Sequence, residues 1–400
     1  MIIRGNKAWE EIKKAISKKT SDKKLSLTVS EIIESVRKDG DAALIKLARR
    51  FEEPTPEKII LTDEDVRKAV NRVSSESRQV IERAAENIRA FAGAVVKSIQ
   101  PVRLERDCYI VGMDYRPVAS VGCYVPSGRY PLPSSALMTA ITAKAAGVKN
   151  IAIASPKMPD EVIYAGIIAG ATRFYKIGGA QAIAALAFGT KSISPVDLIV
   201  GPGNAYVTEA KRQLAGIVGI DMLAGPSEVV IIADEGANPE WLATEMRAQA
   251  EHDPLTGAWL LTDSNELAKK MGDKTLRILV LKDFDECALA SDMLAPEHLV
   301  LAVKDPGSLK AKLKNYGALF MGNEATVVFG DYMSGPNHTL PTGTTARFSE
   351  GLNPRTFLRA QSWFAPKGDV SSLAKDTFKF AQIEGLYYHA EAARLRIKSL

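Results

Sequence analysis

The feature that most constrains this chain is a regular alternation, from about residue 115 onwards, of short β-branched runs with longer alanine-rich stretches. The first series predicts strands at 118–125, 150–154, 174–177 and 197–200, separated by helices at 134–146, 161–170, 180–187 and 205–214. The second predicts strands at 228–233, 259–261, 278–281 and 299–302, with helices at 241–251 and 266–271. Such repetition is typical of a parallel doubly wound sheet. The sequence therefore predicts an α/β fold with two Rossmann-like halves.

The two ends of the chain lack this alternation. Apolar residues recur at helical spacing through residues 1–98, and Thr62 with the acidic residues after it indicates a helix N-terminus. From about residue 352 we again expect helix, ending in a long helix that carries Lys and Arg. Helical segments should therefore flank the two Rossmann-like halves.

Composition and charge exclude several classes of protein. The chain has 400 residues, of which 46% are hydrophobic, so it can bury a sizeable core and is not disordered. The net charge is +5: residues 1–50 hold 13 Lys and Arg against 7 Asp and Glu, and the other 350 residues hold 39 against 40. This distribution favours a solvated helical face over a nucleic-acid surface. We see no apolar signal region and no apolar run that could span a bilayer. Three cysteines without close spacing indicate a reducing compartment, so we expect a cytoplasmic protein without nucleic-acid or membrane partners.

Turns rich in glycine or proline follow predicted strands at 124–128, 178–181 and 201–204, and a further one at 225–227 precedes a strand. Neither half carries the Gly-x-Gly-x-x-Gly fingerprint, and there is no Walker A loop. These strings are either ordinary turns or places where backbone N–H groups approach a phosphate. Any dinucleotide would therefore bind in some other way than by the usual fingerprint.

The chain has four histidines: His252, His298, His338 and His389. None has the spacing that signals zinc strongly. Gln249 and His252 lie three positions apart on a predicted helix, and Asp331 follows a predicted strand at 326–330, where α/β sites collect. An amide oxygen, a carboxylate and imidazoles suit Zn²⁺, and the lack of thiolates favours an open, substrate-binding site. The alternative is that the histidines bind no metal and are either hydrogen-bonded within the protein or exposed to solvent.

Two long strings, at 177–187 and 201–212, are highly specific. Other matching residues occur in a fixed order along the chain: Tyr124, Ser227, Gln249, His252, Glu297, His298, Asp331, His338, Glu384 and His389. From about residue 25 onwards the chain resembles the histidinol dehydrogenase family. This resemblance implies a zinc-dependent, NAD-linked enzyme of histidine biosynthesis that oxidises L-histidinol through L-histidinal to L-histidine with two NAD.

The resemblance also implies a role for each matching residue. Gln249, His252, Asp331 and His389 would bind one zinc ion per subunit. His298 would be the general base and Glu297 would activate water. Ser227, His338 and Glu384, together with His298 and the zinc ligands, would contact the substrate. Tyr124, Gln181 and Asn204 would line the NAD site.

The family is a homodimer in which the C-terminal segment completes the partner's site, so the resemblance implies that Glu384 and His389 act across the interface. It divides the chain into a helical segment at 1–20, a metal- and substrate-binding Rossmann-like domain at 21–122 and 229–351, an NAD-binding Rossmann-like domain at 123–228, and a C-terminal segment at 352–400. The turn at Ser127 and Arg129-Tyr130 departs from many relatives, which have smaller residues there. This departure concerns only local NAD contacts.

General chemistry is compatible with these roles. An alcohol loses a hydride easily only as its proton leaves, which requires a base with a pKa near neutrality, such as His298. Three alternatives stay open: another small alcohol as substrate, attack of Cys123 on an aldehyde, and a zinc hydrolase that needs no nucleotide. We favour a packing role for Cys123. A non-catalytic homologue would have lost Glu297 or His298, and both are present.

Overall fold

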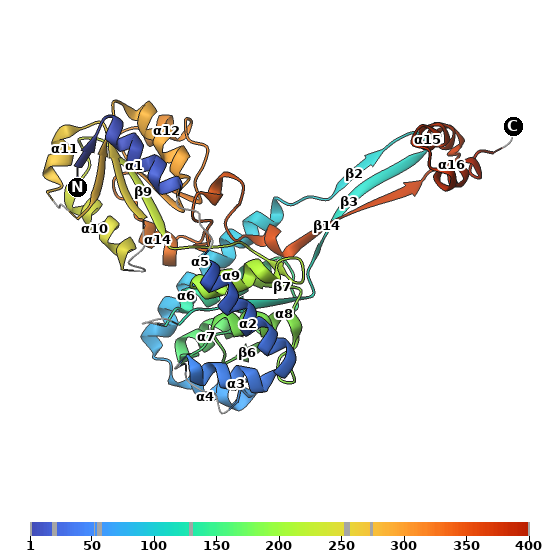
Figure 1. Cartoon of the computed structure of the whole chain (residues 1–400), viewed down its shortest axis with the longest axis horizontal. Helices are drawn as coiled ribbons and strands as arrows, with labels where there is room; N and C mark the ends of the chain where they lie inside the picture. The colour runs from blue at the N-terminus through green and yellow to red at the C-terminus, as the bar shows by residue number, and fades with distance from the viewer. Residues whose placement is uncertain are drawn as a thin grey trace. The chain divides into compact units, whose positions relative to one another are not determined.

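The computed structural model describes residues 2–17, 22–51, 53, 58–127, 131–251, 257–272 and 275–398. They form two compact units (Figure 1). The larger unit comprises Met1–Val96 and Val118–Phe357, and the smaller one comprises Lys97–Pro117 and Leu358–Leu400. Among the described helices, none combines the length and apolar character that crossing a membrane requires.

The first sheet of the larger unit has five parallel strands (Figure 1). In spatial order they are β6 (Arg173–Tyr175), β5 (Asn150–Ala154), β4 (Ser120–Tyr124), β7 (Leu198–Val200) and β8 (Gly219–Ile220). The helices between them are α6 (Pro133–Ala145), α7 (Asp160–Ala169), α8 (Gly179–Phe188) and α9 (Ala205–Leu214). In chain order the strands run 3-2-1-4-5, which is the order of a Rossmann-like sheet.

The second sheet has six parallel strands. In spatial order they are β1 (Ile2–Arg4), β11 (Arg277–Val280), β10 (Gly257–Thr262), β9 (Glu228–Ala233), β12 (His298–Ala302) and β13 (Ala318–Met321). Its helices are α1 (Asn6–Ile16), α10 (Pro239–Ala250), α11 (Asn265–Lys270), α12 (Phe284–Leu294), α13 (Pro306–Lys310) and α14 (Val327–Tyr332). From β9 to β13 the order is again 3-2-1-4-5, so the predicted pair of doubly wound, Rossmann-like halves is confirmed.

Strand β9 shows why this second sheet needs helices on both faces. Val230 and Ile232 join one apolar core with residues of α1 and α12, whereas Val229 and Ile231 join another with residues of α10 and α11. Figure 1 shows these two pairs of helices on opposite sides of the sheet. A strand covered on both faces reads as a continuous apolar run, which made it easy to predict.

Four helices follow α1 in the chain: α2 (Lys23–Asp39), α3 (Asp41–Arg50), α4 (Asp63–Arg72) and α5 (Ser75–Lys97). The apolar face of α2 packs against α8 and α9, and α4 packs against α7. Helices α2, α3 and α4 therefore lie with the five-stranded sheet, which differs from the predicted grouping of 21–122 with 229–351. Of the N-terminal elements, β1 and α1 pack with the six-stranded sheet.

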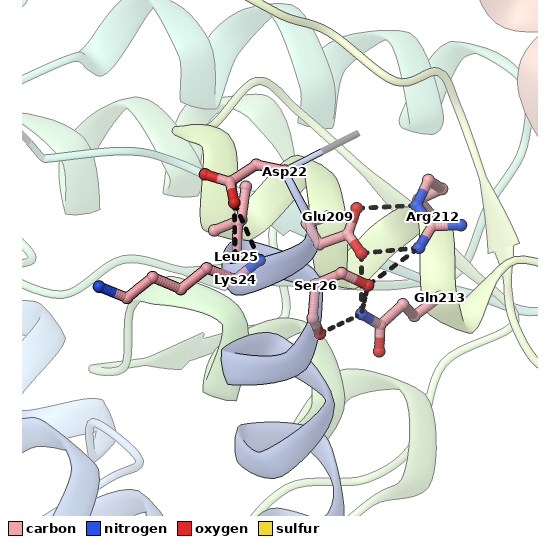
Figure 2. Close-up of polar contacts among 7 residues, drawn as sticks. All are labelled: Asp22, Lys24, Leu25, Ser26, Glu209, Arg212 and Gln213. Atoms are coloured by element: carbon pink, nitrogen blue, oxygen red, sulfur yellow. Dashed lines mark hydrogen bonds and ion pairs between the residues drawn. The ribbon is translucent and has the colours of Figure 1, made fainter. Parts of the chain in front are cut away.

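Polar contacts also fasten α2 to α9 (Figure 2). The Glu209 carboxylate accepts hydrogen bonds from Arg212 and Gln213, and the Gln213 amide donates to the Ser26 carbonyl at 2.8 Å. Asp22 begins α2 by accepting hydrogen bonds from the backbone N–H groups of Lys24 and Leu25. The Arg212 guanidinium lowers the pKa of Glu209 to about 2.

The smaller unit contains a three-stranded antiparallel sheet of β14 (Leu358–Pro366), β3 (Tyr109–Pro117) and β2 (Val102–Glu105). The helices α15 (Ser371–Ile383) and α16 (Tyr387–Arg394) follow it. The expectation of continuous helix from residue 352 is therefore wrong for β14. The long C-terminal helix is also two helices, because Gly385 adopts a left-handed conformation with φ 74° between them.

The predicted strand at 326–330 is instead part of helix α14. Glu245, on α10, accepts hydrogen bonds from the Thr326 hydroxyl at 2.6 Å and from the Val327 N–H at 2.9 Å. These contacts satisfy donors that a helix start leaves without an intrahelical partner. The β-branched residues alone favour a strand, but the Glu245 carboxylate, from another part of the chain, stabilises the start of a helix.

Candidate active site

The amino edge of the six-stranded sheet gathers the predicted acid–base pair. His298 begins β12 and lies in register with Val229 of β9. The Glu297 carboxylate accepts hydrogen bonds from the Glu228 N–H, at 3.0 Å, and from the Ser227 hydroxyl. Glu297 and His298 are only 6% and 4% exposed. The structure therefore brings Ser227, Glu297 and His298 together in a buried setting.

The imidazole of His298 lies near two carboxylates. Its Nδ1 is 3.8 Å from Oε2 of Glu297, and its Nε2 is 4.0 Å from Oδ1 of Asp331. Both separations exceed hydrogen-bond length, so neither carboxylate holds the ring directly in this arrangement. Each is close enough to stabilise a positive charge on the ring. His298 is therefore placed to accept a proton.

Asp331 reaches this site from α14 rather than from a strand end. Its backbone carbonyl oxygen lies 2.9 Å from Nδ1 of His338, so His338, a predicted substrate-binding residue, lies beside Asp331. Burial raises the pKa of Asp331 to about 7, and the nearby Glu245 carboxylate adds to the shift. Burial likewise raises the pKa of Glu297 well above its usual range. The raised pKa makes the carboxylate form of Glu297 a stronger base than an exposed carboxylate.

A cavity of about 590 Å³ opens onto His298, Asp331 and His338. Apolar side chains, including Phe91 and Phe329, line other parts of its wall. This volume lies in the range of small-molecule sites, which combine apolar walls with a few polar groups. The cavity can therefore hold a small polar molecule against the His298 imidazole.

Gln249 lies near the end of α10 and is 1% exposed. Its amide oxygen has no hydrogen-bond partner among the described residues. A buried amide oxygen in this state costs free energy unless a ligand or ion completes it. His252 lies outside the described residues, so its predicted pairing with Gln249 stays a prediction.

Glu384 and His389 belong to the smaller unit. Glu384 follows α15, His389 lies on α16, and both side chains are exposed. Within the described part of the chain, no three His, Cys, Asp or Glu side chains gather as a metal site would require. The proposed zinc ligands are thus not assembled within one described unit.

The three predicted NAD residues lie at the carboxyl edge of the five-stranded sheet. Tyr124 ends β4, and its hydroxyl accepts a hydrogen bond from the Gly179 N–H at the start of α8. Asn204 caps α9, where its side-chain oxygen accepts from Tyr206 and Val207. Strands β4 and β7 are neighbours at the point where the strand order reverses, and this is where doubly wound sheets bind ligands.

Gln181 has a partner that the sequence did not indicate. Its amide donates a hydrogen bond to the Glu53 carboxylate at 2.9 Å, and it is 2% exposed. Burial raises the pKa of Glu53. Gln181 therefore lies at the carboxyl edge of the five-stranded sheet, as predicted for an NAD residue, but its amide is bound by Glu53 of the N-terminal segment.

Cys123 is fully buried within β4. Burial raises the pKa of its thiol to about 12, so the nucleophilic thiolate is scarce at neutral pH. This finding favours the packing role over attack on an aldehyde.

Comparison with known proteins then decides the family. The sequence model described as histidinol dehydrogenase matches residues 16–397. The chain belongs to the histidinol dehydrogenase family. Histidinol dehydrogenase of Methanocaldococcus jannaschii is 41% identical over 97% of this chain and 96% of its own length. The crystal structure of histidinol dehydrogenase from Elizabethkingia anophelis covers 99% of this chain and 98% of its own, with 31% identity and a TM-score of 0.91.

Family membership confirms the resemblance but does not identify every residue that shapes the site. Glu228 and Glu245 were missed, although each contacts a candidate residue or its helix. Glu245 precedes Gln249 by one helical turn, so the two lie on one helix face, and this spacing could have indicated it. Glu228 directly follows Ser227, at the start of a strand whose register places it beside Glu297.

Proposed function

We propose that the chain oxidises L-histidinol through L-histidinal to L-histidine, with two NAD, in histidine biosynthesis. Membership of the histidinol dehydrogenase family supports the substrate and the reaction. The observation that carries the proposal is the buried His298 imidazole. It lies between the Glu297 and Asp331 carboxylates, and His298 also lines the cavity.

In the first oxidation, His298 takes the proton of the substrate hydroxyl while a hydride leaves the carbon that carries this hydroxyl. The adjacent carboxylates stabilise the imidazolium that results. In the second oxidation, the aldehyde must first add water. Glu297 takes a proton from that water, and its raised pKa makes its carboxylate form a stronger base than an ordinary glutamate.

Zinc fits the residues on this side of the site. The buried Gln249 amide oxygen lacks a partner among the described residues, and Asp331 supplies a buried carboxylate. With His252 and His389 they form a donor set of oxygen and nitrogen atoms that suits one Zn²⁺ per subunit. When bound, the ion would orient the imidazole and amine of the substrate without any redox change of its own. Ser227, His338 and Glu384 would contact the substrate.

NAD fits the carboxyl edge of the five-stranded sheet, beside Tyr124, Gln181 and Asn204. Glycines at 178, 179, 201 and 203 let the turns of this edge pack tightly, since a Cβ at any of them would collide with neighbouring protein atoms. When bound, NAD would supply the hydride acceptor for each oxidation. On this proposal, 123–228 serves the nucleotide and 229–351 the metal and substrate.

We further propose a homodimer in which Glu384 and His389 complete the partner's site. Large apolar side chains surround these two residues on α15 and α16 and are strongly exposed, including Phe380 at 63%, Ile383 at 82% and Tyr388 at 83%. Exposed apolar surface of this kind is typical of an interface. In a closed two-fold dimer, each subunit would receive Glu384 and His389 from the other.

The experiment is NADH formation by the purified protein with histidinol and NAD, and with each omitted. We expect absorbance of NADH only when both are present, and its loss by about 10²–10⁴-fold in His298→Asn. Consumption of a substrate without NADH would instead indicate a hydrolase and overturn the proposal.

A further inference from the structure

A buried ion pair lies next to the proposed NAD site and has no role in the chemistry described above. The Lys211 ammonium, on α9, lies 2.6 Å from the Asp221 carboxylate, which follows β8. Their side chains are 3% and 0% exposed. Two opposite charges are thus almost completely removed from water.

This pair binds both polar backbone groups of Gly201. Lys211 donates a hydrogen bond to the Gly201 carbonyl at 2.6 Å, and the Gly201 N–H donates to Asp221 at 2.7 Å. Asp221 also accepts from the Met222 N–H at 2.6 Å. One residue of the turn after β7 is therefore held from both sides by charged groups, and such hydrogen bonds are stronger than neutral ones.

Gly201 occupies a place where its conformation matters for the nucleotide site. Its φ is 111°, and a Cβ there would collide with the carbonyl oxygen of Tyr124. The backbone after β7 thus lies directly against the end of β4. Three residues later, Asn204 begins α9. The conformation of Gly201 therefore sets how Tyr124 and Asn204, two of the proposed NAD residues, lie relative to each other.

Stability alone does not account for such a pair. Removing two charges from water costs free energy that their attraction often only offsets, and well-packed apolar residues of similar volume serve stability equally well. The pair instead supplies directed hydrogen bonds to one peptide unit, which apolar side chains cannot do. Its contacts converge on the turn at 201–204.

We propose that Lys211 and Asp221 are positioning residues for the nucleotide site, which hold the 201–204 turn in the conformation that binds NAD. This inference rests on the proposed function, since it takes NAD as the ligand of that edge. It assigns no contact with NAD to either residue. The pair acts through Gly201, and its loss should weaken NAD binding while leaving the histidinol site at the other sheet intact.

The test compares Lys211→Met, Asp221→Asn and the double variant. Each single variant leaves one buried charge without its partner and should lower the melting temperature. The double variant has no buried charge and retains similar side-chain volumes, so we expect it to recover most of that loss. The Kd for NAD, measured by calorimetry on the full chain, should nevertheless stay raised by about tenfold in the double variant. The KM for histidinol, at saturating NAD, should change less than twofold.

A matched control replaces the exposed ion pair of α11 by Lys269→Met with Glu266→Gln, which should change neither the melting temperature nor the Kd for NAD appreciably. A double variant that recovers both stability and NAD affinity would overturn the inference, because the pair would then be merely structural. Equal weakening of histidinol and NAD binding would overturn it as well. If the unmodified protein binds no NAD, the proposed function itself fails, and that result is distinct from either outcome above.

Discussion

Nε2 of His298 lies 4.0 Å from Oδ1 of Asp331, although one residue begins a strand and the other lies on a helix 33 positions later. Glu245 maintains this relationship, because its carboxylate binds the first turn of the helix that carries Asp331. On the other side of the ring, Glu297 Oε2 lies 3.8 Å from Nδ1. The proposed general base thus lies between two carboxylates, one from the residue before β12 and one from α14, and the role of each can be tested.

Replacing Glu297 by Gln keeps the side-chain shape but removes the group that would take a proton from water. We expect the second oxidation to slow by about 10²-fold and the first by less than about tenfold, because His298 still serves the alcohol. Single-turnover traces started separately from histidinol and from histidinal measure the two steps.

Glu286→Gln is a suitable control for that experiment, since this carboxylate lies in the first turn of α12 and accepts a hydrogen bond from the Lys282 N–H instead of from a site residue. It should leave both steps unchanged. Equal losses from both starting compounds in Glu297→Gln would mean that Glu297 only positions His298.

Removing divalent metal should abolish activity and leave the fold largely intact. The two sheets bury their own apolar cores, so the larger unit does not depend on an ion for folding. Circular dichroism of metal-stripped protein should match that of the untreated protein, and zinc should restore the activity. Full activity after thorough stripping would be incompatible with the proposed zinc site.

A site shared between two subunits predicts complementation. His389→Ala and His298→Ala should each be inactive alone. After mixing under conditions of subunit exchange, mixed dimers carry one site with both histidines, so some activity should return. If exchange is verified by mass and no activity appears, His389 does not act across an interface.

The contacts that fasten α2 to α9 predict an acid-dependent loss of stability (Figure 2). The pKa of Glu209 is lowered from 4.5 to about 2 in the folded chain, chiefly by Arg212. Its carboxylate therefore contributes stability fully above about pH 4.5, and this contribution is lost as the pH falls towards 2. Because Arg212 is half exposed, we expect a contribution of only about 1 kcal/mol.

Urea unfolding of the native chain and of Glu209→Gln at pH 6 and at pH 3 measures this contribution. The difference in unfolding free energy between the two should shrink at the lower pH. A difference that stays constant would show that Glu209 does not gain its stability from ionisation. Glu266→Gln, in an exposed pair on α11, provides the comparison.

Elements with strong local patterns were predictable from the sequence. Strand β9 and helix α9 match their predicted bounds, because one is a continuous apolar run and the other begins at an Asn cap. Helix α14 was misread as a strand, because the carboxylate that stabilises its start lies on another helix. Strand β14 was missed because its register is set by β3, more than 240 positions away along the chain. Local patterns cannot contain such long-range pairings.

The candidate site was predictable to a similar extent. Among the residues that the family resemblance selects, Ser227 and Glu297 lie beside His298 at the edge of the six-stranded sheet. His298 and His338 line the same cavity. The grouping of 21–122 with the six-stranded sheet differed, because many helices have an apolar face and the sequence does not say which sheet will cover it. Glu384 and His389 lie in the smaller unit, and their action across a dimer interface stays a proposal.

The stoichiometry of NADH is the most direct test of the central claim that one site carries out two successive oxidations. With limiting histidinol and excess NAD, the NADH formed is measured by absorbance and the remaining histidinol and histidine by chromatography. The account predicts two NADH and one histidine for each histidinol consumed. One NADH for each histidinol, with histidinal as the product, would contradict it.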